Sequence, residues 1–226
     1  MRVVVRTWNV FHGRTWPESG ALRLEEAVRL VTHDAPALVA LQEVPLWALR
    51  RLESWSGLEA LAAPTKRAFL GPLAAGAQRR WPRLVRSSLS GQANALLVAP
   101  GFPVREACAV RIDLGVVERR VAQRVEVGGV IVVNAHCSQA PAFARDELER
   151  IRALLPEAGP CVVCGDLNLP GAGLPGFSAP LPGIDQVLVR GLELVQGPES
   201  WPDERRTAGG VLLSDHAPVE AEMMWP

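Results

Sequence analysis

The stretch that decides the fold of this chain is Cys164-Gly165-Asp166-Leu167-Asn168, and Ser214-Asp215-His216-Ala217-Pro218 accompanies it near the end of the sequence. The polar residues of both motifs follow apolar runs, and so do Asn9 and Glu43 much earlier in the chain. A strand that ends at the rim of a sheet delivers its last side chains to that rim, where ligands commonly bind. Acids, amides and a histidine gathered in this way predict a hydrolytic site that holds a divalent metal.

The composition is that of an ordinary soluble globular protein. The 226 residues are 48% hydrophobic and 21% charged, which is enough to build a sizeable core. No apolar run reaches the ~18 residues that a membrane span needs. The first residues, 1–6, return to charge too early for a signal peptide, so a cytoplasmic protein is expected. We expect one domain, residues 1–226, acting as a monomer.

The net charge is zero, but the charges are unevenly distributed. Between Ala60 and Arg105 the chain has no acidic residue. This segment either attracts a phosphate-bearing partner such as nucleic acid or forms a solvated arginine loop, and the sequence leaves both open. Its basic residues are Lys66, Arg67, Arg79, Arg80, Arg83, Arg86 and Arg105.

Cys161 and Cys164 form a C-x-x-C pair, which is a pattern found in zinc and redox sites. They lie in an apolar run that is typical of a strand, where residues three apart point to opposite faces. The sequence has no second C-x-x-C that would complete a four-ligand zinc site. The pattern therefore predicts buried core thiols.

Strands and helices alternate along the chain. Helical apolar spacing occurs over 22–31, 45–52 and 143–155. The Gly128-Gly129 pair predicts a hairpin between two of the strands, and 187–189 with 192–195 is interpreted as another strand pair. Loops at 64–92 and 170–183 are interpreted as insertions. Mixed strands with helices outside predict a two-sheet α/β sandwich. The expected strands are 2–8, 37–42, 94–99, 104–112, 120–127, 130–135, 161–164, 187–189, 192–195 and 217–223.

The polar residues suit metal-assisted chemistry. Glu43 is a hard oxygen ligand for Mg²⁺ or Mn²⁺, and Asn9 can add a carbonyl oxygen. Asp215 and His216 are adjacent and point in different directions, so one can serve the metal while the other meets the substrate. Asp185 is a candidate partner that fixes the tautomer of His216.

Asp166 and Asn168 are two residues apart, so they would project to the same side if their strand continued. One could then accept a proton from water while the other donates a hydrogen bond to the reacting group.

Six motifs in order resemble the endonuclease/exonuclease/phosphatase superfamily, which includes deoxyribonuclease I-like nucleases, abasic-site endonucleases, inositol polyphosphate 5-phosphatases and neutral sphingomyelinases. Together they span residues 8–218. The motifs are Trp8-Asn9, Leu41-Gln42-Glu43, Asn134-Ala135-His136, Gly165-Asp166-Leu167-Asn168, Ile184-Asp185-Gln186-Val187 and Ser214-Asp215-His216-Ala217-Pro218.

The resemblance implies a deoxyribonuclease I-like, four-layer α/β sandwich with two mixed sheets flanked by helices. It also implies cleavage of a phosphoester with Mg²⁺ or Mn²⁺ as cofactor. The implied metal ligands are Asn9, Glu43 and Asp215. The implied catalytic residues are His136, Asp166, Asn168, Asp185 and His216, and the implied substrate-binding residues are Arg120 and Asn94.

The chain departs from the family pattern in two places. It has no tyrosine, so the active-site tyrosine of abasic-site endonucleases is absent. His136 stands at the corresponding strand end, as in deoxyribonuclease I and the sphingomyelinases. The carboxylate that would pair with this histidine is not evident in 87–94, where Gln92 or Asn94 stands instead. The two roles that the resemblance implies for His136 are contact with the phosphate and service as an acid.

The leading functional hypothesis is a metal-dependent phosphodiesterase that acts on nucleic acid. The alternative is the same chemistry on a small phosphorylated molecule or a lipid headgroup. A non-catalytic binding module is disfavoured because the acidic, amide and histidine positions are all present. His12 could touch the substrate phosphate, but the favoured interpretation is a solvent-contacting loop residue. Trp47 and Trp55 are interpreted as packing residues, and the loop residues Trp16, Trp81 and Trp201 as candidate stacking platforms.

Overall fold

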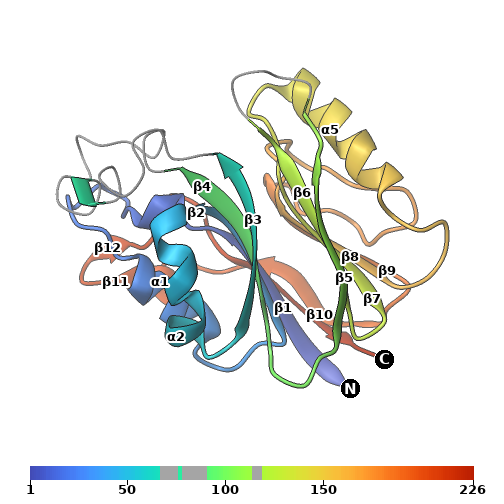
Figure 1. Ribbon diagram of the computed structural model, residues 1–226, viewed down its shortest axis with the longest axis horizontal. Coiled ribbons are helices and arrows are strands. Elements are labelled where there is room, and N and C mark those ends of the chain that lie inside the picture. Colours follow the sequence, from blue (N-terminus) through green and yellow to red (C-terminus); the bar gives the residue numbers. More distant parts are fainter. Residues whose placement is uncertain (67–75, 78–90, 114–118) are drawn as a thin grey trace.

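The computed structural model describes residues 1–66, 76–77, 91–113 and 119–226. Two β-sheets face one another, and helices cover the outer face of each (Figure 1). The result is the four-layer α/β sandwich that the resemblance implied. The two chain ends lie together, and the N-terminal amine donates a hydrogen bond to the carbonyl of Trp225 (2.6 Å).

The first sheet has six strands in the order β10-β13-β1-β2-β4-β3. β1 and β2 are parallel, and every other pair is antiparallel. β1 and β2 therefore bring their carboxyl ends to the same edge of the sheet. The strands are β1 (Arg2–Asn9), β2 (Leu38–Pro45), β3 (Glu59–Lys66), β4 (Gln92–Val98), β10 (Leu194–Ser200) and β13 (Val219–Met224).

The second sheet has five strands in the order β5-β6-β7-β8-β9. β7 and β8 are parallel, and the other neighbours are antiparallel. The predicted hairpin is confirmed: Gly128 and Gly129 join β6 to β7 with φ of 54° and 81°, which suits glycine at both turn positions. The strands are β5 (Val104–Arg111), β6 (Val121–Val127), β7 (Val130–His136), β8 (Cys161–Asp166) and β9 (Asp185–Arg190).

Helices α1 and α2 pack on the outside of the first sheet, and α5 packs on the outside of the second (Figure 1). In the described part of the chain, no helix has the length and apolarity needed to cross a bilayer. The helices are α1 (Leu24–Thr32), α2 (Leu52–Ser56) and α5 (Pro141–Ala153), and the 3₁₀ turns are η1 (Phe11–Gly13), η2 (Leu46–Arg51) and η3 (Asp203–Arg206). A small two-stranded ribbon comprises β11 (Thr207–Ala208) and β12 (Val211–Leu212).

A buried polar contact joins the two sheets. The Gln42 side-chain amide on β2 donates to Asn134 Oδ1 on β7 at 2.8 Å. Asn134 Nδ2 in turn lies 3.3 Å from the carbonyl oxygen of Leu41 and 3.1 Å from that of Ala95. Buried amides require such partners, so these contacts restrict how the sheets can slide past one another.

The two cysteines of the C-x-x-C pair are free thiols in β8. Cys161 belongs to the core beneath α5, whereas Cys164 belongs to the core between the sheets. The prediction of buried thiols on opposite faces is therefore confirmed.

Three local expectations were wrong. Segments 187–189 and 192–195 do not pair, because β9 lies in the second sheet and β10 pairs with β13 in the first. The helix expected over 45–52 is a 3₁₀ turn followed by the short helix α2. Part of the expected loop at 64–92 is the end of edge strand β3, whose low burial hides the usual strand pattern.

Candidate active site

The predicted site residues gather where the two sheets meet at their strand ends. Asn9 closes β1, His136 closes β7 and Asp166 closes β8. Because β9 runs antiparallel to β8, Asp185 at its start pairs in register with Asp166. Parallel register also sets His136 beside Asp166.

Gly165 allows β7 and β8 to approach each other just before the site. Its φ is 141°, and a Cβ built on it would lie 1.9 Å from the carbonyl oxygen of Ala135. Only glycine fits such a backbone approach. Gly165 therefore sets the spacing between the strand ends that present His136 and Asp166.

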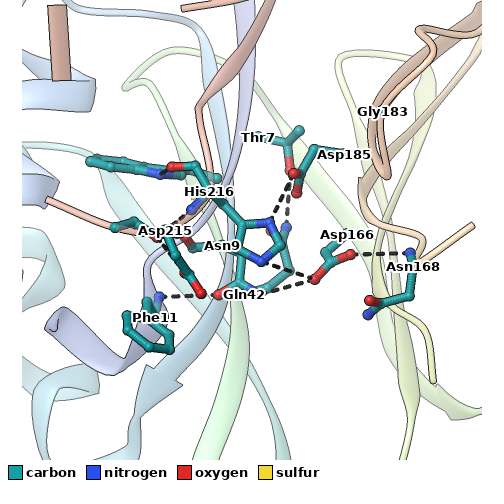
Figure 2. A network of polar contacts seen from close by, with 12 residues as sticks. Thr7, Asn9, Phe11, Gln42, Asp166, Asn168, Gly183, Asp185, Asp215 and His216 are labelled. Carbon is teal, nitrogen blue, oxygen red and sulfur yellow. Dashed lines mark hydrogen bonds and ion pairs between the residues drawn. The ribbon is translucent and has the colours of Figure 1, made fainter. Parts of the chain in front are cut away.

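His216 lies between two carboxylates (Figure 2). Its Nδ1 is 2.8 Å from Asp185 Oδ2, and its Nε2 is 3.8 Å from Asp166 Oδ2. Burial alone would lower the pKa of His216, but the hydrogen bond and charge of Asp185 outweigh it and raise the pKa to about 9. The ring is thus oriented by Asp185 and presents Nε2 to the site.

Asp166 is almost completely buried. Asn9 Nδ2 donates to its Oδ2 and the backbone N–H of Asn168 donates to its Oδ1, both at 3.0 Å (Figure 2). Burial, together with the nearby charge of Asp185, raises the pKa of Asp166 to about 7. Two carboxylates in so small a space form a site that favours a positive partner.

The strand-based account of Asn168 was wrong. β8 ends at Asp166, and Asn168 lies in a turn with φ of 50°. The turn nonetheless keeps the two side chains close, because Asp166 Oδ1 accepts the Asn168 N–H. The Asn168 side-chain amide donates to the carbonyl of Cys137 at 2.9 Å, which ties the turn to the end of β7.

Glu43 lies at an irregularity in β2, where the register with β4 shifts between Leu41 and Val44. Its φ is 57°, so the side chain turns toward the second sheet's histidine: Oε1 lies 3.9 Å from His136 Nε2. Burial would raise the pKa of Glu43, but the hydrogen bond and charge of His12 hold it well below its usual range. Glu43 is therefore ionised at neutral pH.

His12 is the site residue that was missed. It was interpreted as a solvent-contacting loop residue, whereas its side chain is 8% exposed and its Nε2 lies 2.7 Å from Glu43 Oε2. The available signal was its position three residues after Asn9, the end of the first strand, and directly before Gly13, which allows the tight turn η1.

His136 lies 3.4 Å from Asp166 Oδ2 through its Nε2. Burial, reinforced by the positive charge of Arg120, lowers the pKa of His136 to about 3. The ring is therefore neutral at physiological pH. Arg120 is itself buried near this histidine, directly before β6.

The remaining predicted residues differ in how near they come to the center of the site. Asp215 lies at its exposed edge, and partial desolvation and the charge of Glu43 raise the pKa of Asp215. Asn94 is buried, and its amide donates to the carbonyl of Val121 at 2.9 Å, a contact between the two sheets. This contact gives Asn94 a structural task in addition to the predicted one.

Buried hydrogen bonds hold the loop that carries His216 in place. Arg206 Nη1 donates to the carbonyls of Ser214 and His216, both at 2.9 Å, and Trp8 Nε1 donates to the latter at 2.9 Å. The Ser214 hydroxyl donates to the carbonyl of Asn9 at 2.7 Å and accepts the His216 N–H at 3.1 Å. Ser214 therefore shapes the turn.

The candidate stacking residues differ from expectation. Trp201 is buried, and Arg205 lies over its ring at 3.6 Å, so the expected base platform is wrong there. Trp16 is 53% exposed. Trp81 and the arginines of 67–86 lie outside the described residues, so the expected partner of that basic segment stays a prediction.

Two groups of residues could hold a cation. Ligand atoms of Asp166, Asp185 and His216 all lie within 4.8 Å of one another. Glu43, the implied metal ligand, lies on the first sheet with Asn9 close by. Carboxylate and amide oxygens are the ligands that Mg²⁺ and Mn²⁺ prefer, so the donor set fits the implied metal.

Comparison with solved structures shows the same fold elsewhere. An endonuclease/exonuclease/phosphatase from Beutenbergia cavernae DSM 12333 has a TM-score of 0.76 at 17% identity, with 99% of this chain and 72% of that chain covered. Truncated TDP2 from Caenorhabditis elegans has a TM-score of 0.65 at 15% identity, covering 99% and 98%. An endonuclease/exonuclease/phosphatase from Bacteroides vulgatus has a TM-score of 0.65 at 16% identity, covering 100% of both chains.

Sequence comparison assigns the family. No curated protein sequence matches the chain. The sequence model of the Endonuclease/Exonuclease/phosphatase family, however, matches residues 7–216, which include the site residues from Asn9 to His216. The chain therefore belongs to the endonuclease/exonuclease/phosphatase family.

Proposed function

We propose that this protein is a cytoplasmic, monomeric phosphodiesterase that depends on Mg²⁺ or Mn²⁺ and cleaves nucleic acid by attack of water. The observation that carries the proposal is the pairing of buried Asp166 with half-buried Asp185, with the His216 ring held between them at 3.8 and 2.8 Å. In such an arrangement the carboxylate can accept a proton from water, and the histidine can separately bind a phosphate oxygen. Family members act on phosphoesters, which supports the same chemistry here.

Glu43 would hold the metal, with Asn9 and Asp215 as further oxygen ligands. When bound, a divalent cation neutralises charge on the phosphate oxygens and so stabilises the transition state. Glu43 suits this role because the pKa of its carboxyl is well below the usual range, so it is ionised at neutral pH.

The chain's own residues would supply the proton chemistry. Asp166, whose pKa of about 7 makes it a usable base near neutral pH, takes the proton from the attacking water. Asn168 donates a hydrogen bond to the reacting phosphate. His216, protonated because its pKa is about 9, contacts a phosphate oxygen while Asp185 holds its Nδ1.

His136 and Arg120 would bind the phosphate rather than move a proton. The pKa of His136 is about 3, so near neutral pH the ring is neutral and lacks the imidazolium proton that a general acid would donate. Of the two roles that the sequence left open for this histidine, phosphate contact is therefore favoured. Asn94 would support the same part of the site from the first sheet.

One observation favours the alternative substrate class, which lacks a base to be stacked. Trp201 is buried against Arg205 and is not available to stack on a base. A small phosphorylated molecule or a lipid headgroup would need no such platform. The chemistry at the scissile bond would be the same.

A substrate panel tests the proposal. Purified protein is assayed with plasmid, single-stranded and abasic DNA, inositol phosphates, sphingomyelin and a chromogenic phosphodiester, each with Mg²⁺, Mn²⁺ or a chelator. We expect metal-dependent cleavage that E43A abolishes and that E157Q, at an exposed glutamate, retains. Undiminished activity of E43A would rule out the mechanism. Cleavage of the small substrates alone would select the second class.

A further inference from the structure

His12 has no assigned role, yet it is aimed at the candidate metal ligand. It lies in the 3₁₀ turn η1, one residue beyond the strand that ends in Asn9. Its side chain is 8% exposed, and its Nε2 lies 2.7 Å from Glu43 Oε2. Its Nδ1 has no hydrogen-bond partner among the described residues. The polar contacts of this ring that the structure shows therefore all go to Glu43.

The turn holds His12 in that position. Its φ is 55°, in the left-handed region that residues other than glycine seldom adopt. Gly13 follows with φ of 80°, and a Cβ there would lie 2.6 Å from Leu24 Cβ. Hydrogen bonds from Gly13 N to the carbonyl of Val10 and from Arg23 N to the carbonyl of Gly13, both 2.7 Å, close the turn. The turn thus fixes the direction in which the His12 side chain leaves the backbone.

The spacing of the two ligand atoms suits a shared cation. Two ligand atoms at right angles around an ion, each about 2.1 Å away from it, are about 3 Å apart. Nε2 of His12 and Oε2 of Glu43 are 2.7 Å apart, so a small shift brings both into contact with one ion once the ring carries its single proton on Nδ1 and the proton on Nε2 has left to solvent.

We propose that His12 supplies Nε2 as a nitrogen ligand to the cation held by Glu43, and that it shifts the preference of the site from Mg²⁺ toward Mn²⁺ and later divalent metals. This inference rests on the proposed function, since it takes Glu43 as the metal ligand. Imidazole nitrogen binds Mg²⁺ poorly, and the affinity of nitrogen-containing sites for divalent metals rises from Mn²⁺ toward Cu²⁺. A site made only of oxygen ligands would discriminate less.

Metal titration tests the preference. Calorimetry with Mn²⁺ alone and Mg²⁺ alone is carried out on the wild type, H12Q and H33Q, where His33 is an exposed histidine on a helix end. We expect tighter binding of Mn²⁺ in the wild type, a loss of about tenfold in Mn²⁺ affinity in H12Q, and a smaller change for Mg²⁺. H33Q should match the wild type. An equal Mn²⁺/Mg²⁺ affinity ratio in the wild type and H12Q would overturn the inference.

Pulsed electron paramagnetic resonance of bound Mn²⁺ gives a readout independent of affinity. A nitrogen coupling should be present in the wild type and weaker or absent in H12Q and H12N, whose folding is checked by circular dichroism. A wild type without nitrogen coupling, or variants that keep it unchanged, would refute the ligand role. If both variants unfold, the coupling is recorded in H136Q and H216Q, where persistence supports His12 and its loss in either contradicts the inference.

These outcomes separate the inference from the proposed function. A protein that cleaves a phosphodiester but shows no nitrogen coupling retains the function and loses the inference. A protein that binds Mn²⁺ through His12 but cleaves no substrate of the panel retains the inference and loses the function.

Discussion

The contact between Asp185 and His216 predicts a large change in the titration of that histidine. The substitution D185N keeps the shape of the side chain but removes the negative charge 2.8 Å from Nδ1. The difference between the ordinary pKa of 6.5 and about 9 corresponds to about 3 kcal/mol in favour of the charged ring. Asp185 contributes most of this, with smaller contributions from Asp166 and Asp215. Burial alone lowers the pKa, so D185N should bring it toward or below the ordinary value.

The same contact makes stability depend on pH in a definite direction. A histidine whose pKa is raised on folding stabilises the folded state below its unfolded pKa, and this contribution disappears as the pH rises through the folded pKa. Without metal, the wild type should therefore lose up to about 3 kcal/mol of unfolding free energy between pH 6.5 and 9. D185N should show a flatter profile over that range.

Both effects are measurable with a chelator present. Histidine side-chain NMR titration reports the pKa of His216, and urea denaturation at several pH values reports the free energy of unfolding. D146N, at an exposed aspartate on α5, is the matched control and should resemble the wild type. A His216 titration in D185N that remains near the wild-type midpoint would show that Asp185 does not set the charge of this ring.

Three further predictions concern stability and the support of the site. G165A should cost about 2–4 kcal/mol, because its Cβ would lie 1.9 Å from a carbonyl oxygen of β7; a loss below ~1 kcal/mol in urea denaturation would contradict this. R206K should lower the unfolding free energy by about 1–3 kcal/mol, since the single nitrogen of lysine cannot replace the three guanidinium nitrogens that contact the two carbonyls and Asp203 Oδ1; unchanged thermal denaturation would refute it. The pKa values of Asp34 and Glu220 are lowered chiefly by contacts with Arg6 and Arg205. The stability that these two carboxylates contribute should therefore disappear as the pH falls through their pKa values in the folded protein. The melting temperature of the double variant D34N/E220Q should accordingly fall less steeply at acid pH than that of the wild type.

Much of the site could be predicted because each residue follows an apolar strand. Asn9, His136 and Asp166 are the last residues of β1, β7 and β8, so strand prediction alone places them at one rim. Asp185 was paired with His216 by chemical argument, and the structure shows the contact at 2.8 Å. Strand ends are readable in sequence because the apolar run stops there.

Other features depended on backbone conformation that the residue pattern does not reveal. Asn168 and His12 both adopt left-handed φ, so neither side chain points where strand or loop periodicity would direct it. The bulge at Glu43 has the same effect on β2. Trp201 is a core residue that packs with the apolar cluster of the first sheet and contacts Arg6 and Arg205, and no local pattern indicates that.

The sequence by itself determined the family, the order of the motifs and the residues that meet at the rim, because strands and their polar ends are local properties of the chain. Only the tertiary structure decided which strands share a sheet, as β9 and β10 show, and which charges meet across the two sheets. Those contacts determine protonation: Asp166 is placed near a pKa of 7 and His216 near 9 by burial and by neighbours distant in sequence. Desolvation and charge proximity exist only once the sheets have packed, and for that reason Cys164-Gly165-Asp166-Leu167-Asn168 alone indicates a hydrolytic site without revealing its proton chemistry.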